Sequence, residues 1–475
     1  MARLLGIDVG TSGVKVVLLN ERGEVLKQAS RSYPMATPRP GWAEQSPMEW
    51  WLATVACLGE IDEPSIDAIG VTGQMHGSVF LDEEGNVIRP ALLWCDQRTG
   101  EEVEAFTEKV GEAKLREITG NPLLTGFQLP KVHWLAKNEP ESFAKVGKIL
   151  LPKDFIVWQL TDRFSTDVSD ASGIGVVDLK ARDYSPLLLE AAGLGRHLFP
   201  DVHESSAVVG KTVGGPTWRK GIPVVAGAGD QAAGAVGSGA IQPGMGTISL
   251  GSSGVAFAAV SEPVLDTTTT LHSFCHANEN WHVMGVMLSC GAAIAWARDL
   301  LLPGASFDEF SELAAKSEIG SRGVTFLPYL SGERCPVVER RPFGTFAGMS
   351  VAHGASDLAR AVFEGVSFGI SDMVEEVEKH ASFGRVRIIG GGAKSAFWSQ
   401  MVSDVVGRPI HHLAAEEGPS YGAALLAGVG IGVWPSVEAS CADSIREIGV
   451  TEPSGNEYTE ALNRYRSLYP TLSAW

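Results

Sequence analysis

The chain has 475 residues, of which 44% are hydrophobic and 20% are charged, a composition typical of a globular protein large enough for two domains. The net charge of −18 argues against a general affinity for nucleic acid, whose phosphate backbone attracts clustered lysine and arginine. The 6 cysteines form no CxxC pair, so neither a zinc ribbon nor a disulfide framework is indicated. The longest apolar tract, residues 222–241, is interrupted by Asp230 and several glycines and does not predict a membrane span. Since no signal peptide is visible either, we expect a cytoplasmic protein.

The first predicted element is a strand, a glycine turn and a second strand within residues 4–26. An apolar run ends at Asp8, passes through the Gly-Thr-Ser-Gly sequence of residues 10–13 and resumes with β-branched residues. A turn with two glycines and two hydroxyls can direct several backbone N–H groups at one phosphate. Asp8 then lies where a phosphate-bound Mg²⁺ needs an oxygen ligand or a water anchor. An ordinary glycine-rich hairpin with an aspartate at a strand end is the alternative interpretation.

A second copy of this pattern occurs near the middle of the chain. Residues 248–255 (Ile-Ser-Leu-Gly-Ser-Ser-Gly-Val) align with residues 7–14, and an apolar run again follows. Similarity at half the chain length indicates a duplicated domain. Ser249 stands where the first copy has Asp8, so only the first copy would bring a carboxylate to a metal. The sequence therefore predicts two phosphate turns facing each other across a cleft.

Strands alternate with helices in both halves, which indicates α/β layers. The elements predicted between the two copies are helices at 47–58, 101–118, 130–137, 153–161 and 186–192, strands at 66–72 and 222–226, a hairpin of 79–81 with 87–93, and a helix ending near Gly239. The elements predicted after the second copy are strands at 272–276, 281–284, 324–330 and 386–389 and helices at 290–302, 357–380, 397–406 and 421–427. We place the domain boundary between residues 240 and 241, which gives domains of residues 1–240 and 241–475.

Asp230 is the candidate general base. It follows a predicted buried strand and begins a predicted helix near the middle of the chain, where it can accept a hydroxyl proton while the hydroxyl oxygen attacks phosphorus. Residues 227–232 also fit the dinucleotide pattern G-x-G-x-x-A. Asp230 would direct a carboxylate at the pyrophosphate, however, and no acid follows about 20 residues later, which argues against a nicotinamide enzyme. A helix cap is the remaining alternative for Asp230.

A group of histidines and one cysteine invites interpretation as a metal site. His272 and Cys275 fall on opposite faces of a strand, so only His272, His276 and His282 could share one face. We interpret them as structural histidines, with a catalytic or structural metal as the alternative.

Several long motifs occur in one order along the chain. They are Ile7–Asn20, Gly73–Gly77 (GQMHG), Leu150–Phe155 (LLPKDF), Ala226–Gly237, Ser249–Val255, His272–Ala277, Leu327–Arg334 and Gly390–Met401. Together they resemble the FGGY carbohydrate kinases over essentially the whole chain, and GQMHG points to xylulose rather than glycerol. The resemblance implies an α/β fold of two duplicated ribonuclease-H-like (actin-like ATPase) domains flanking a central cleft that holds ATP and sugar. The N-terminal domain would bind the sugar and the C-terminal domain the nucleotide.

The resemblance also implies roles for individual residues. Asp230 matches the family's catalytic base, and Asp8 matches its Mg²⁺-associated acid. The implied nucleotide-binding residues are Thr11, Ser12 and Gly13 in the first turn, Gly251 and Ser252 in the second, and Gly391, Gly392, Ala393 and Ser395 in an adenosine-side loop. The implied sugar-binding residues are Met75, His76, Trp94, Asp96, Asp230 and Gln231. Gln231 and Cys95 depart from the family's pattern on the sugar side, which leaves the identity of the pentulose more open than the reaction.

The reaction implied by the resemblance is transfer of the γ-phosphate of MgATP to the C5 hydroxyl of D-xylulose. One alternative is the same chemistry on another ketose or polyol, such as ribulose. An alternative from another class is a non-catalytic, nucleotide-gated protein of the actin or chaperone type, which needs no sugar pocket. The expected partners are ATP, Mg²⁺ and a sugar, with neither nucleic acid nor membrane, and a homodimer is the default assembly.

Overall fold

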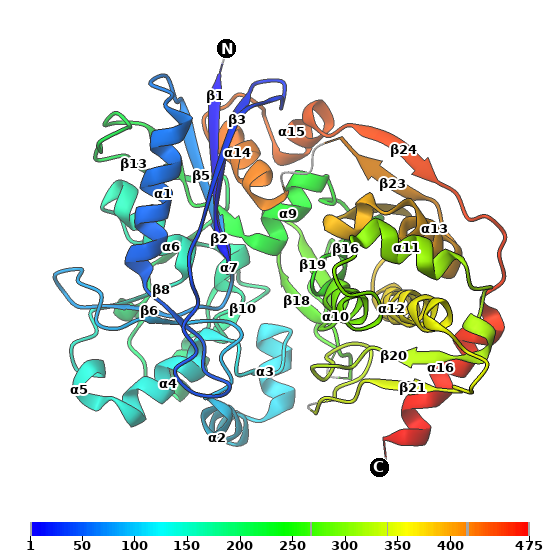
Figure 1. The fold of residues 1–475 in the computed structure, drawn as a ribbon. Helices are drawn as coiled ribbons and strands as arrows, with labels where there is room; N and C mark the ends of the chain where they lie inside the picture. The colour runs from blue at the N-terminus through cyan, green and yellow to red at the C-terminus, as the bar shows by residue number, and fades with distance from the viewer. Residues whose placement is uncertain (1, 267, 340, 415–417, 474–475) are drawn as a thin grey trace.

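The protein folds into two halves, each built around a seven-stranded mixed sheet. The computed structural model describes residues 2–266, 268–339, 341–414 and 418–473. In Figure 1 the first half of the chain lies on the left and most of the second half on the right. The helices between and around the two sheets make the layered α/β architecture that the sequence predicts.

The first sheet carries the predicted glycine turn at the edge where β1 ends. Its strands are β1 (Arg3–Val9), β2 (Gly13–Asn20), β3 (Val25–Ser32), β5 (Ala68–Gly73), β13 (Val208–Lys211), β14 (Pro223–Val225) and β15 (Ala228–Gly229). β1 pairs antiparallel with β2 and parallel with β5, and β5 pairs parallel with β14 and β15. β1 is a nearly continuous apolar run because helices cover both faces of its sheet.

The second sheet repeats this arrangement. Its strands are β16 (Met245–Leu250), β17 (Gly254–Val260), β18 (His272–Cys275), β19 (Trp281–Met287), β22 (Arg385–Ile389), β23 (Ile410–Leu413) and β24 (Glu447–Thr451). β16 pairs antiparallel with β17 and parallel with β22, as β1 pairs with β2 and β5. β22 in turn pairs parallel with β23, as β5 pairs with β14. The duplication predicted from residues 248–255 is confirmed by these strand directions.

The helices and short strands complete the two halves. The helices of the first half are α1 (Pro47–Ile61), α2 (Gly100–Val110), α3 (Glu112–Thr119), α4 (Gln128–Asn138), α5 (Pro140–Phe143), α6 (Pro152–Thr161), α7 (Val168–Ala171), α8 (Pro186–Ala192) and α9 (Asp230–Ser238). The later helices are α10 (Gly291–Leu301), α11 (Phe307–Ala315), α12 (Ala355–Glu378), α13 (Ala396–Val406), α14 (Gly418–Gly430), α15 (Val437–Ser444) and α16 (Thr459–Leu472). The short strands are β4 (Glu44–Gln45), β6 (Val79–Leu81), β7 (Ala91–Leu92), β8 (Lys148–Leu150), β9 (Ser165–Asp167), β10 (Val177–Asp178), β11 (Asp183–Tyr184), β12 (Asp201–His203), β20 (Thr325–Leu327) and β21 (Thr345–Ala347). Among the residues described, no helix combines the length and the hydropathy of a membrane span.

Two predicted elements differ from the structure. The single helix predicted at 101–118 is wrong, because Gly111 adopts φ 90° and separates α2 from α3. The hairpin predicted between 79–81 and 87–93 is reduced to isolated bridges, such as the one between Leu81 and Val87. β6 forms its ladder with β8 instead, and β7 pairs with β4, so long-range partners replace most of the local pairing.

Helices α9 and α14 meet between the two halves through glycine. A Cβ atom on Gly422 would lie 1.9 Å from the carbonyl oxygen of Ala233, so the two helix backbones are in direct contact. α14 also lies against the first sheet, since a Cβ atom on Gly6 would lie 1.8 Å from the carbonyl oxygen of Ser420. Figure 1 shows α14 (orange) beside the first strands of the chain (blue), although it is almost the last helix in sequence. The first sheet therefore depends on a late segment of the chain for one of its covers.

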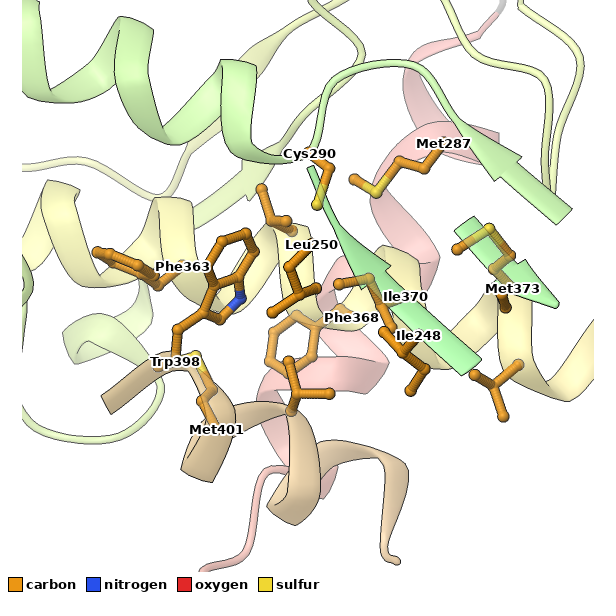
Figure 2. Close-up of a cluster of buried hydrophobic side chains, with 14 of the residues drawn as sticks. Ile248, Leu250, Met287, Cys290, Phe363, Phe368, Ile370, Met373, Trp398 and Met401 are labelled. Atoms are coloured by element: carbon orange, nitrogen blue, oxygen red, sulfur yellow. The ribbon is translucent and has the colours of Figure 1, made fainter. Parts of the chain in front are cut away.

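The second half has a large core of its own between the second sheet and helices α12 and α13. Figure 2 shows Ile248 and Leu250 from β16 facing Phe368 from α12 and Trp398 from α13. The indole nitrogen of Trp398 donates a hydrogen bond to Ser367 Oγ at 3.2 Å, so its only polar atom is satisfied inside the core. This packing fixes β16 and the turn that follows it.

Candidate active site

Asp8 and Asp230 lie at the same edge of the first sheet. β1, β5 and β15 run parallel, and Val9 and Gly229 both pair with Gly73, so the carboxyl ends of the three strands coincide. With neighbouring strands about 4.8 Å apart, the ends of β1 and β15 are separated by about 10 Å. The two carboxylates are close enough for the negative charge of Asp230 to raise the pKa of Asp8.

The environment of Asp8 fits a cation ligand. Burial raises the pKa of Asp8 to about 7, the charge of Asp230 adds to this, and Lys15, its partner on β2, opposes it. The Oδ1 atom of Asp8 is buried and accepts no hydrogen bond from the described residues. A buried carboxylate oxygen without a donor is what Mg²⁺ or its bound water would use.

Asp230 has the environment of a general base. It is the first residue of α9, whose N-cap is Gly229, so Asp230 does not occupy the cap position. Burial raises the pKa of Asp230 to about 6, and a hydrogen bond from Gln231 Nε2 to Asp230 Oδ1 at 3.3 Å works in the opposite direction. A carboxylate with a pKa near neutrality can accept a proton efficiently at physiological pH.

The first glycine turn is held by side chains from several other segments of the chain. Thr11 Oγ1 donates a hydrogen bond to Gln74 Oε1 at 3.2 Å and accepts one from Trp94 Nε1 at 2.9 Å. Gln45 Nε2 donates to the Thr11 carbonyl oxygen at 2.8 Å. Ser12, at the tip, is exposed. The turn is thus fixed from behind, while its tip remains accessible to a ligand.

The second glycine turn lies beside the predicted adenosine-side loop. Gly390 adopts φ 88°, and a Cβ atom there would lie 3.2 Å from the backbone nitrogen of Gly251. The Gly251 carbonyl accepts a hydrogen bond from the Gly291 N–H at 2.9 Å, and Ser252 is exposed. Ser395 caps α13 by accepting a hydrogen bond from the Trp398 N–H at 3.3 Å. The turn and the loop of residues 390–395 therefore form one continuous surface of the second half.

A cleft of about 650 Å³ lies between the two halves. Of the predicted site residues, it is lined by Asp230 and Gln231 from α9 and by Gly391 and Ala393 from the 390–395 loop. The other predicted nucleotide-binding residues lie outside its lining; they are Thr11, Ser12, Gly13, Gly251, Ser252, Gly392 and Ser395. The cleft brings the candidate base and the adenosine-side loop to one space.

Met75 lies next to the residue that precedes the candidate base, and His76 follows Met75 in the chain. A Cβ atom on Gly229 would lie 2.9 Å from Met75 Cγ, so Met75 packs against the residue that precedes Asp230. His76 adopts φ 67°, its Nδ1 lies 2.9 Å from the Gly173 carbonyl oxygen, and its ring stacks on Phe127. Burial lowers the pKa of His76 to about 3, so the imidazole is neutral.

Asp96 is fully buried and already has partners. Its Oδ1 accepts a hydrogen bond from Arg98 Nε at 2.9 Å, and its Oδ2 accepts one from the Ala43 N–H at 2.7 Å. These bonds fix the loop that carries Trp94. A sugar contact by Asp96 stays a prediction, since a hydroxyl would have to share these oxygens.

The three histidines considered as metal ligands have other surroundings. His272 Nδ1 lies 3.1 Å from Asn121 Oδ1, His276 Nε2 lies 3.0 Å from the Ala240 carbonyl oxygen, and the His282 ring stacks on Phe257 at 4.4 Å. Burial lowers the pKa of all three. These contacts are those of structural histidines packed between the halves.

Comparison with protein families decides the kind of protein. The FGGY carbohydrate kinase N-terminal domain matches residues 3–237, and the C-terminal domain of the same family matches residues 246–431. The chain belongs to the FGGY family of carbohydrate kinases. As a member of this family it uses ATP, and its fold is the two-domain, actin-like ATPase fold that the sequence predicts.

Individual FGGY kinases are similar over nearly the whole chain. The xylulose kinase of Escherichia coli K12 is 40% identical over 439 residues, which cover 90% of this chain and 89% of that protein. The xylulose kinase of Bacillus subtilis 168 is 34% identical over 484 residues, which cover 99% of this chain and 97% of the relative. The crystal structure of xylulose kinase from Rhodospirillum rubrum superposes with a TM-score of 0.90 at 28% identity, covering 99% of each chain.

Sequence reasoning missed several residues that shape the site of this FGGY kinase. Gln74 lies in the motif Gly73–Gly77, and a glutamine beside a phosphate turn could have been proposed as its support, whereas Gln45 lies in no predicted motif. Lys131 gave no such signal, because a lysine on a helix usually faces solvent. It is fully buried, and its Nζ donates hydrogen bonds to the carbonyl oxygens of Phe127 at 2.8 Å and His76 at 3.4 Å.

Proposed function

We propose that this FGGY kinase transfers the γ-phosphate of MgATP to the C5 hydroxyl of D-xylulose. The observation that carries the proposal is the position of Asp230. It lines the cleft together with Gly391 and Ala393, and the residue before it packs against Met75. The similarity to the Escherichia coli xylulose kinase supports xylulose as the sugar.

In the proposed reaction, Asp230 accepts the proton of the C5 hydroxyl while the hydroxyl oxygen attacks the γ-phosphorus and the bond to the ADP oxygen breaks. Asp8 would hold Mg²⁺, which supplies positive charge against the β- and γ-phosphates. Positioning and electrostatics account for most of such a reaction, so closure of the cleft that excludes water favours transfer to the sugar.

The two glycine turns would hold the triphosphate through backbone N–H groups. The proposed phosphate contacts are Thr11, Ser12 and Gly13 from the first half and Gly251 and Ser252 from the second. Gly391, Gly392, Ala393 and Ser395 would flank the adenosine. The proposed sugar contacts are Met75, His76, Trp94, Asp96 and Gln231.

ADP production from MgATP with and without D-xylulose tests this function. We expect sugar-stimulated turnover, and we expect Asp230→Ala to lower it by about 10³-fold with nearly unchanged ATP affinity, because general base catalysis contributes about 10²- to 10⁴-fold. An active Asp230→Ala variant would refute the assignment. ATP turnover without sugar stimulation would favour the non-catalytic alternative, and a substrate panel with ribulose, other ketoses and polyols ranks the acceptors.

The domain boundary between residues 240 and 241, the homodimer and the cytoplasmic location remain part of the proposal. Sedimentation of the full chain measures the assembly directly.

A further inference from the structure

The short helix α7 lies directly behind the candidate base. Ser169, in this helix, accepts a hydrogen bond at its Oγ from the Gly229 N–H at 3.1 Å. The same hydroxyl donates to Asp167 Oδ2 at 2.6 Å. Both serine and aspartate are buried, and Gly229 immediately precedes Asp230. The hydroxyl of Ser169 therefore uses its donor and an acceptor position to join the start of α9 to a buried carboxylate.

That carboxylate is itself held by a buried lysine. Lys153 Nζ lies 2.9 Å from Asp167 Oδ1 and 2.6 Å from Asp154 Oδ1, and all three side chains are excluded from solvent. Hydrogen bonds between ionised groups are shorter and about twice as strong as neutral ones, so this anchor is stiff. Lys153 and Asp154 belong to the motif Leu150–Phe155, to which no role has been assigned above.

We propose that Ser169 is a positioning residue for Asp230. The chain of contacts runs from Lys153 through Asp167 to Ser169 and then to the backbone N–H of Gly229, which sets where α9 begins and where its first carboxylate points. A displacement of about 1 Å at a reacting group can cost about 10²-fold in rate. The proposal rests on the proposed role of Asp230 as the base.

Ser205 provides a matched control for Ser169. Ser205 Oγ donates a hydrogen bond to the same Asp167 Oδ2 at 2.9 Å, whereas the side-chain acceptor that the structure gives to the Gly229 N–H, among the described residues, is Ser169 Oγ. Removing either hydroxyl takes one hydrogen bond from Asp167, and Ser169→Ala additionally takes the acceptor from the Gly229 N–H, so Ser205→Ala controls for the lost contact with Asp167. Only the Ser169 variant loosens the start of α9.

The test compares sugar-stimulated ADP production by full-length Ser169→Ala and Ser205→Ala. We expect kcat to fall about 10- to 100-fold in Ser169→Ala, with KM for ATP and for xylulose within about twofold of the parent enzyme. Ser205→Ala should keep kcat within about twofold. Parent-like kcat in Ser169→Ala, or equal kcat losses in the two variants, would overturn the proposal.

Two further variants keep the test decisive. If Ser169→Ala does not fold, Ser169→Cys retains the volume of the side chain with only a weak hydrogen-bonding group, and the same kcat loss is expected. Asp230→Asn separates this proposal from the function on which it rests. An inactive Asp230→Asn with a fully active Ser169→Ala contradicts only the positioning role, whereas an active Asp230→Asn contradicts the proposed base itself.

Discussion

The indole nitrogen of Trp94 donates a hydrogen bond to Thr11 Oγ1 at 2.9 Å. Trp94 belongs to the predicted sugar pocket and Thr11 to the first phosphate turn, so one hydrogen bond joins the proposed binding sites of the two substrates. Gln74, which follows the strand next to β1, completes the contact by accepting from the same hydroxyl. The position of the turn therefore depends on Trp94 and Gln74, of which Trp94 belongs to the predicted sugar pocket.

Trp94→Phe removes this hydrogen bond and keeps most of the ring. A hydrogen bond of this kind contributes about 1 kcal/mol, so we expect kcat/KM to fall about fivefold for ATP as well as for the sugar. Steady-state kinetics with each substrate varied in turn measures both values. Trp281→Phe is the control, because Trp281 Nε1 donates to the Leu179 carbonyl oxygen at 2.8 Å and has no predicted role in the site. A loss confined to the sugar would contradict the coupling.

Asp8→Asn should weaken the use of Mg²⁺. The neutral amide is a poorer ligand than a carboxylate for a hard divalent cation, so the Mg²⁺ concentration needed for half-maximal turnover should rise about tenfold or more. Titration of ADP production with Mg²⁺ at fixed ATP measures the shift. An unchanged titration curve would mean that Asp8 has no part in holding the metal.

The activity should have an acid limb that reflects Asp230. Burial raises the pKa of this carboxyl to about 6, so the group is protonated and unable to accept a proton at lower pH. At saturating Mg²⁺, which keeps Asp8 ionised, kcat/KM should therefore fall about tenfold per pH unit below about 6. Circular dichroism at each pH confirms that the protein remains folded. A profile that stays flat down to pH 5 would exclude Asp230 as the titrating base.

Lys131→Met should affect the sugar rather than the nucleotide. Lys131 holds the carbonyl oxygens of Phe127 and His76, and the backbone of His76 has a positive φ that needs such support. We expect KM for xylulose to rise about tenfold and KM for ATP to stay within about twofold. Lys137→Met, on the same helix, is the control because Lys137 is exposed and pairs with Glu101. Equal effects on both substrates would argue for general destabilisation.

Gly422→Ala should force the two central helices apart. The added Cβ atom would lie 1.9 Å from the Ala233 carbonyl oxygen, and overpacking of this kind costs about 1–3 kcal/mol or more. Calorimetry should show a lower Tm for this variant and no change for Gly449→Ala, whose Cβ atom would meet nothing within 4 Å. An unchanged Tm in Gly422→Ala would show that the helices can separate without cost.

The parts of the site that were predicted from sequence are those that depend on local chain geometry. The turn of residues 10–13, its copy at 251–254 and the strand-to-helix junction at Asp230 follow from apolar runs interrupted by glycine, which leave few other conformations. The break between α2 and α3 could also have been predicted from the sequence, because Gly111 interrupts the predicted helix.

The supporting residues could not be predicted in the same way. Lys131, Lys153 and Ser169 each have a partner that is distant in sequence as well as local ones, and their burial is decided by the packing of several segments at once. The pairing of β6 with β8 has the same origin, since two short strands can join any compatible neighbour. Sequence patterns thus identify the reacting groups, but they rarely identify the residues that hold those groups in position.

Helix α14 has a consequence for any attempt to dissect the molecule. Leu4 and Leu19 pack with Leu425 and Leu426 in one buried cluster. A fragment that stops at residue 240 lacks α14 and therefore exposes a hydrophobic face of its sheet to solvent. Such a fragment should aggregate when it is expressed alone and should remain soluble only when a peptide spanning residues 418–430 is supplied with it. During synthesis, the final tenth of the chain must be reached before α14 can cover strands β1 and β2.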